Sequence, residues 1–114
     1  MADTLPRSTP PHVRAAIAEA KARLETIYGS RLARVVLYGS YARGEARDDS
    51  DVDLLIVLQG EVEPYTEIRR TGRLALDLLL DHGADVSIQP YSVRDAEDLR
   101  RPFIQNVLAD GVAL

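Results

Sequence analysis

A Gly-Ser pair and an Asp-x-Asp pair, each at one end of an apolar run, constrain the fold of this chain more than any other feature. Gly39 and Ser40 follow one apolar run, and after ten intervening residues Asp51 and Asp53 flank the start of another. Short apolar runs bounded by turn residues are typical of buried β-strands. We therefore predict two strands, with a glycine–serine turn leaving the first and two carboxylates at the head of the second.

The rest of the chain predicts helices between strands. Apolar residues recur at helical spacing over 13–27 and 68–79, and Gly29 and Gly83 fit the ends of these helices. Strands that alternate with helices indicate an α/β fold, a small mixed β-sheet flanked by helices. The predicted elements are a helix capped by Ser8 or Thr9 with Pro10 and Pro11 in its first turn, a strand over 33–38, a helical turn over 40–44, a strand over 52–58, a helix from Pro64 to 82–83, a strand over 84–89 closed by Pro90, a helical region capped by Ser92 and interrupted at Pro102, and an edge strand over 112–114.

Composition indicates one globular domain over residues 1–114, with a loose lead-in over 1–9. The chain is 46% hydrophobic and 28% charged, and its net charge of −4 argues against extended nucleic acid as a partner. The absence of cysteine excludes disulfides and thiolate metal sites. No apolar run approaches the roughly 20 residues of a membrane span. With no signal-peptide pattern at the start, we expect a cytoplasmic protein without membrane contact.

The paired aspartates suit a magnesium ion. Residues i and i+2 of a strand point to the same face, about 7 Å apart, so Asp51 and Asp53 present two carboxylates together. Asp48 and Asp49 bring the acids to four within six positions, a crowding that solvation or a cation must relieve. Mg²⁺ prefers one or two carboxylates completed by phosphates and water. One Asp-x-Asp pair is also expected by chance, so the strand context carries the prediction.

Asp85 is the candidate for a third metal-binding acid. It lies near the start of the predicted strand over 84–89. There it would complete a site for two metal ions about 3.5–4 Å apart, the spacing of two-metal active sites. It would also accept the proton of an attacking hydroxyl. The alternative is an acid at a strand end without a ligand role, because the pairing of the strands is not visible in the sequence.

The Gly-Ser pair predicts a phosphate site beside the acids. Glycine tolerates positive φ and lets the backbone approach a phosphate closely, and we expect Ser40 to cap a short helical turn whose free amides favour an anion. Arg43 and Arg47 follow in the same connection. Each either assists a triphosphate or carries ordinary surface charge.

Some conspicuous side chains have a simpler interpretation. Tyr38 and Tyr65 are expected to pack against the core. Tyr41, at the mouth of the predicted site, either packs or touches a nucleotide. The pair at 69–70, both arginine, is expected on a solvated face, with contact to an acidic partner as the alternative.

The pattern Gly39-Ser40-x10-Asp51-x-Asp53 resembles the signature of the DNA polymerase β-like nucleotidyltransferase superfamily. The stretches 39–54 and 101–112 are similar to the minimal nucleotidyltransferase (MNT) family. The resemblance implies a polymerase β-like nucleotidyltransferase fold. It also implies specific roles for the matching residues, which are Asp51, Asp53 and Asp85 as catalytic and metal-binding acids for two Mg²⁺ ions, and Gly39 and Ser40 as contacts to the phosphates of ATP.

The resemblance also implies a function. Active members of the family transfer AMP from ATP to a tyrosine of a HEPN-domain toxin, and so act as MntA-type antitoxins of type VII toxin–antitoxin pairs. A hetero-oligomer with a HEPN-domain partner is then expected, with Arg43 a further candidate for nucleotide binding. Two alternatives stay open: a non-catalytic antitoxin that neutralises its partner by binding, and an enzyme that modifies a small molecule or an RNA end.

Overall fold

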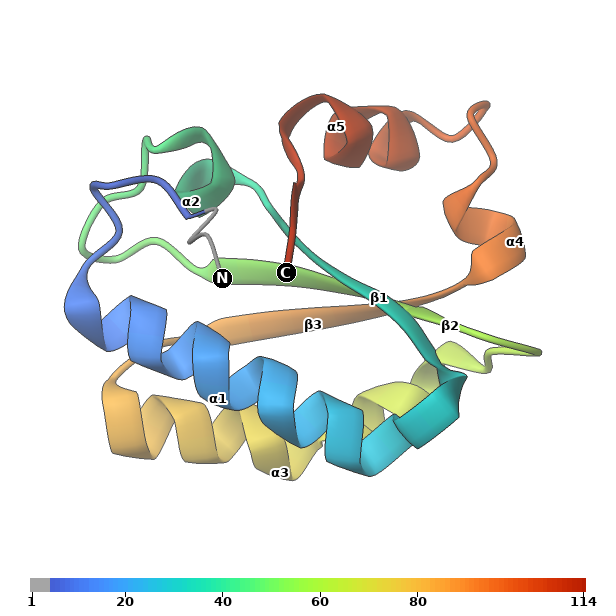
Figure 1. Ribbon diagram of the computed structural model, residues 1–114, viewed down its shortest axis with the longest axis horizontal. Coiled ribbons are helices and arrows are strands. Elements are labelled where there is room, and N and C mark those ends of the chain that lie inside the picture. Colours follow the sequence, from blue (N-terminus) through green and yellow to red (C-terminus); the bar gives the residue numbers. More distant parts are fainter. Residues whose placement is uncertain (1–4) are drawn as a thin grey trace.

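Four strands form one mixed sheet in the computed structural model, which describes residues 5–114 (Figure 1). They are β1 (Leu32–Tyr38), β2 (Val52–Leu58), β3 (Val86–Ser92) and β4 (Val112–Ala113), in the spatial order β3-β2-β1-β4. β2 runs antiparallel to β1 and parallel to β3, and β4 runs antiparallel to β1. The predicted small mixed sheet is confirmed.

Helices cover both faces of this sheet. α1 and α3 lie side by side on one face, and α4 and α5 lie over the other (Figure 1). None of the helices in residues 5–114 is both long and apolar enough to cross a membrane. The helices are α1 (Pro11–Tyr28), α2 (Ser40–Arg43), α3 (Pro64–His82), α4 (Val93–Ala96) and α5 (Pro102–Asp110), with a 3-10 turn over Gly29–Arg31.

The central strand β2 divides the interior into two cores. Leu54 and Ile56 belong to the larger core, beneath α1 and α3, whereas Leu55 and Val57 belong to the smaller one, beneath α4 and α5. Successive residues of a strand point to opposite faces. Asp53 therefore shares the face of Leu55 and Val57, on the α4/α5 side of the sheet.

The predicted boundaries of β3 and the predicted cap of α1 are wrong. β3 begins at Val86 rather than at residue 84, and it does not close at Pro90 but continues through it to Ser92. Because β3 is an edge strand, its proline sits where a missing amide hydrogen is tolerated. Neither Ser8 nor Thr9 caps α1; the N-cap is Pro10, without a side-chain hydrogen bond.

The segment just before α1 is tied to that helix. The Thr9 amide donates to the carbonyl of Pro6 at 3.0 Å, and Arg14 donates to the carbonyls of Pro6 and Thr9 at 2.7 and 3.1 Å. The loose lead-in expected over 1–9 is thus a held turn over 6–9, and residues 1–4 lie outside the described part. The predicted stops at Gly29 and Gly83 are confirmed, as is the cap at Ser92, whose hydroxyl accepts from the amide of Asp95 at 3.0 Å.

A buried carboxylate joins α1 to α3. Glu67 is only 3% exposed; it accepts hydrogen bonds from the Tyr28 hydroxyl and from Arg31, each at 3.0 Å, and Arg70 lies 3.4 Å away. Burial, and then the hydrogen bond to Glu67, raise the pKa of Tyr28. Since a buried charge is tolerated only with such partners, this cluster fixes how the two helices meet.

Candidate functional site

The two carboxylates predicted together lie at the head of β2. Asp51 directly precedes the strand and is exposed, whereas Asp53, within the strand, is half-buried and pairs in register with Tyr38 of β1. Burial and the neighbouring charge of Asp51 raise the pKa of Asp53, and the charge of Arg43 partly opposes this shift. The pair therefore holds more negative charge than its surroundings compensate, which is the electrostatic condition for binding a cation.

Gly39 lies directly against Asp53 of this pair. It directly follows β1 with φ of +77°, a conformation that favours glycine, and a Cβ at this position would collide with the Asp53 carboxylate oxygen Oδ2. The backbone of the Gly-Ser turn thus lies directly against Asp53. Two segments that are well separated in sequence, the turn after β1 and the acids of β2, form one continuous surface.

Ser40 has a different place from the one predicted. The N-cap of α2 is Gly39, and Ser40 is the first helical residue, without a side-chain cap hydrogen bond. The prediction that Ser40 caps the turn is wrong because the chain enters the helix one residue earlier. In the described part of the chain no hydrogen bond links the Ser40 hydroxyl to another residue, so it remains available as a donor at the start of α2.

Asp85 lies beside Asp51, immediately before β3. The carbonyl of Asp85 accepts a hydrogen bond from the Val52 amide at 2.8 Å, and Val52 pairs with Val86 in the parallel register. Extending that register back by one residue sets Asp85 next to Asp51. The Asp85 side chain is exposed, so no burial penalty requires it to have a partner.

The three acids do not form a closed metal cage. Among the described residues, no three acidic, histidine or cysteine side chains are grouped closely enough to hold one ion. The other acids of the loop lie elsewhere, since Asp48 and Asp49 act on Tyr41 and raise its pKa, after burial. What fits a cation is the Asp51–Asp53 pair, because Mg²⁺ is commonly held by one or two carboxylates and completed by phosphate oxygens.

Arg43 reaches the site from α2 but already has partners. Its guanidinium pairs with Glu45 and with Asp110, each at 3.1 Å. Asp110 is the last residue of α5, so this contact ties α2 to the C-terminal helix. A phosphate contact from Arg43 requires it to exchange these partners, and the sequence did not reveal this, because Asp110 lies 67 residues away.

An aromatic cluster borders the acids on the same face. Tyr38 meets the ring of Phe103 edge-on, with centroids 5.3 Å apart, and the ring centroid of Tyr91 also lies 5.3 Å from that of Phe103, at a tilt of 34°. Burial, Asp53 and Tyr91 raise the pKa of Tyr38 to about 12. Tyr38 packs as predicted. The only feature of the sequence that indicated its place next to Asp53 is its position directly before Gly39. Tyr41 is 5% exposed and packs in the larger core.

Comparison with known proteins agrees with this arrangement. The family described as "Nucleotidyltransferase domain" matches residues 17–110. This chain belongs to that family. The nucleotidyltransferase domain is 34% identical over 96 residues to a Methanocaldococcus jannaschii protein named "Putative protein adenylyltransferase MJ0141", a match that covers 84% of this chain and 92% of the relative.

Solved structures place the domain among the minimal nucleotidyltransferases. One, described as "Structure of putative minimal nucleotidyltransferase", is 28% identical with a TM-score of 0.59, and the match covers 90% of this chain and 92% of that one. A chain in a crystal structure of a toxin–antitoxin with AMP-PNP has the same TM-score of 0.59 at 19% identity, covering 83% of this chain and 69% of its own. At that identity the likeness establishes a shared fold. The family resemblance seen in the sequence is therefore confirmed.

Proposed function

We propose that this nucleotidyltransferase transfers AMP from ATP to a tyrosine hydroxyl of a HEPN-domain toxin and thereby acts as the antitoxin of a type VII pair. The observation that carries the proposal is the contact of the Gly39 turn with the Asp51–Asp53 pair, which joins a surface for phosphates to a surface for a cation. The name of the M. jannaschii relative and the fold shared with a toxin–antitoxin structure support it.

The chain's residues have distinct roles in this reaction. Asp51 and Asp53 would hold Mg²⁺, and the ion, when bound, would supply charge neutralisation at the reacting phosphate. The Gly39 backbone lets the triphosphate approach closely, and the free Ser40 hydroxyl donates to it. Arg43 is a further phosphate contact once it leaves Glu45 and Asp110.

The transfer itself is a single displacement. The tyrosine oxygen forms a bond to the α-phosphorus of ATP, the bond from that phosphorus to the bridging oxygen of the β-phosphate breaks, and pyrophosphate leaves. The proton of the hydroxyl passes to a carboxylate, and Asp85 is our candidate, because it is exposed and lies next to Asp51. Most of the rate gain then comes from positioning and charge stabilisation.

The test is transfer of label to a partner. Purified chain is mixed with a HEPN-domain protein that co-purifies with it, Mg²⁺ and ATP labelled at the α-phosphate. We expect label on the HEPN-domain protein, and its loss in Asp51→Asn and Asp53→Asn. Asp49→Asn, an exposed acid of the same loop, is the matched control and should retain transfer. An unlabelled partner, or label that persists in both variants, contradicts the proposal.

The fold shared with a chain of a toxin–antitoxin structure equally supports a second candidate, an antitoxin that acts by binding alone. The two candidates differ in their need for ATP. If binding is sufficient, the chain suppresses the toxin without nucleotide, and Asp51→Asn and Asp53→Asn suppress it equally well. If transfer is required, removal of either ATP or Mg²⁺ restores toxicity. Label that appears on a small molecule or an RNA end instead identifies a different acceptor.

A further inference from the structure

One side of α3 is apolar and yet exposed. The residues on this side recur at intervals of three and four, with Gly72 at their centre, whereas the opposite side of α3 is buried against the protein. A helix that is apolar on both sides is usually covered on both. We name the exposed side the α3 stripe; its apolar members, with their exposed fractions, are Tyr65 (73%), Ile68 (48%), Leu76 (48%), Leu79 (46%) and Leu80 (71%).

Tyr65 shows how far this surface departs from expectation. The sequence predicts that Tyr65 packs, but 73% of it is exposed, so that prediction is wrong. The side chain of this residue lies on the α3 stripe, together with leucines that a monomer leaves in water. Contiguous exposed apolar surface of this kind marks a site of protein contact.

A row of four charges follows one border of the α3 stripe. Arg69, Arg73, Asp77 and Asp81 recur every four residues, so they lie along the same side of the helix. Arg73 and Asp77 pair with each other at 2.8 Å, and Asp77 also pairs with Arg23 at 2.8 Å. The outer two are exposed, and in the described part of the chain neither forms an ion pair. The row is basic at its N-terminal half and acidic at its C-terminal half.

Two copies of such a row place opposite charges side by side when they run antiparallel to each other. When two copies meet through the α3 stripe about a two-fold axis with antiparallel helices, each border faces the same border of the other copy, running in reverse. If the crossing lies between Gly72 and Leu76, Arg69 comes level with residue 79 of the second copy, between its Asp77 and Asp81. Parallel helices set the charged borders on opposite sides, where they do not meet.

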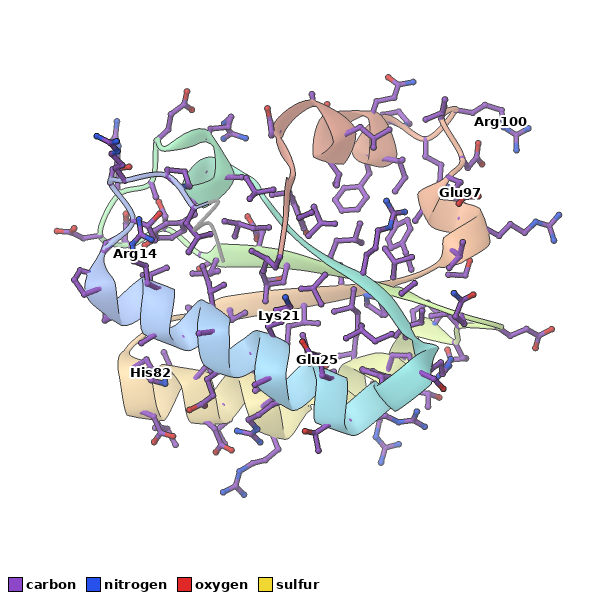
Figure 2. All side chains as sticks on the ribbon, viewed as in Figure 1. Arg14, Lys21, Glu25, His82, Glu97 and Arg100 are labelled. Atoms are coloured by element: carbon purple, nitrogen blue, oxygen red, sulfur yellow. The ribbon has the colours of Figure 1, made fainter. Side chains whose placement is uncertain are left out.

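Gly72 fits the crossing point. A Cβ built at Gly72 meets nothing within 4 Å, so the helix surface is open there. A glycine at the centre of a helix costs stability in an isolated domain, but it lets a second helix approach closely. The side chains of α3 that point away from α1 and the sheet extend into solvent (Figure 2).

We propose that the α3 stripe is the contact surface of a homodimer in which two copies of this chain pack antiparallel through α3. The self-complementary charge row identifies the second copy as the occupant. The candidate site lies on the α4/α5 side of the sheet, opposite the side that α3 covers (Figure 1). A dimer formed through α3 therefore leaves the candidate site accessible. Failure of the dimer proposal would therefore leave the proposed transfer reaction untouched, and the reverse also holds.

The first experiment measures the mass of the full chain by sedimentation velocity from about 1 μM to about 0.5 mM, which covers micromolar to submillimolar dissociation constants. We expect a concentration-dependent dimer for the wild type and a monomer for Leu76→Glu. Leu80→Lys is a second variant at the most exposed leucine of the stripe. Leu108→Glu, on α5 and 59% exposed, is the matched control and should still dimerise. A wild type that stays monomeric throughout, as it would if only another protein covers the stripe, overturns the proposal.

The second experiment tests the orientation by charge reversal. Arg69→Glu and Asp81→Arg each place like charges together at two symmetric contacts, so each should weaken dimerisation by about tenfold. The double variant restores opposite charges in the antiparallel arrangement and should recover most of the wild-type affinity. Singles that weaken the dimer without recovery in the double refute the antiparallel contact, and circular dichroism of each variant verifies that it is folded.

Discussion

Replacing Asp53 by asparagine should stabilise the protein while it removes nucleotidyl transfer. Burial and the charge of Asp51 raise the pKa of Asp53, so its ionised form is less favourable in the folded chain than in the unfolded one. The ionised carboxylate therefore costs stability at neutral pH. An asparagine at this position keeps the shape of the side chain without the charge, which removes this cost together with the proposed ligand of the cation.

The electrostatic repulsion between Asp51 and Asp53 sets the size of the stabilisation expected from Asp53→Asn. Two strand positions separate Asp51 from Asp53, about 6.7 Å at about 3.3–3.4 Å per residue. With an effective dielectric constant of about 40–80, appropriate because Asp51 is exposed, the repulsion amounts to about 0.6–1.2 kcal/mol at low ionic strength. Physiological salt roughly halves it at this distance. Loss of the attraction to Arg43 works against the gain, and relief from burial adds to it.

The assay is a double-mutant cycle in unfolding free energy. Urea unfolding of the wild type, Asp51→Asn, Asp53→Asn and the double variant isolates the coupling between the two positions. At about 10 mM salt we expect Asp53→Asn to raise the unfolding free energy by about 1 kcal/mol, or the melting temperature by about 4 °C. The gain should be smaller when Asp51 is already replaced by asparagine. Asp49→Asn is the control, with an expected change within about 0.5 kcal/mol.

The pH dependence of the stability difference between Asp53→Asn and the wild type can refute this reasoning. At a pH above the raised pKa of Asp53 the carboxylate is charged, and the stabilisation by Asp53→Asn is fully present. As the pH falls through that pKa towards the usual value of 3.8, the wild-type carboxyl becomes protonated and the difference disappears. An Asp53→Asn variant that is less stable than the wild type at pH 7 and low salt, or whose gain is independent of pH, refutes the reasoning.

Three further changes test other parts of the structure. Gly39→Ala should lower stability by about 1–3 kcal/mol and abolish transfer, because the methyl group meets Asp53 at positive φ; thermal melts and labelled ATP measure the two effects. Glu67→Ala should cost about 1–3 kcal/mol of unfolding free energy, because it leaves the buried Tyr28 hydroxyl without its partner and removes one of the hydrogen bonds of Arg31; a change below about 0.5 kcal/mol in urea unfolding contradicts that role. Asp85→Asn should lower the rate of transfer with little change in the melting temperature, since the side chain is exposed; single-turnover kinetics would show unimpaired transfer if Asp85 has no part in proton transfer.

Local sequence patterns predicted the fold closely where each element is governed by its own residues. β1 and β2 were located from their apolar runs, and α3 from its periodicity and Gly83. The Gly39 turn and the acid pair were predictable for the same reason, because positive φ and i, i+2 spacing are local properties. The meeting of these two features across the β1–β2 pair followed from a short antiparallel connection.

The features that the sequence did not predict are those that depend on where an element lies in the folded sheet. Pro90 stays within β3 because that strand lies at an edge, and the order of strands is not written in any one of them. The partners of Arg43 were hidden for a similar reason, since Asp110 is brought to it only when α5 folds over the sheet. For Tyr65 the packing prediction failed because helical periodicity does not say which side of a helix with apolar residues on two sides faces the core.

The two faces of the sheet therefore serve separate purposes. On the α4/α5 side, the half-buried charge of Asp53 lowers stability, as expected where binding rather than folding is optimised. On the α1/α3 side, the Glu67 cluster and the larger core supply the rigidity that holds β2, and with it the acid pair, in place. A change on the outer surface of α3 should then alter association without altering the candidate site, and a change at Asp53 should alter the site without altering association. That separation makes the transfer reaction and the homodimer open to independent tests.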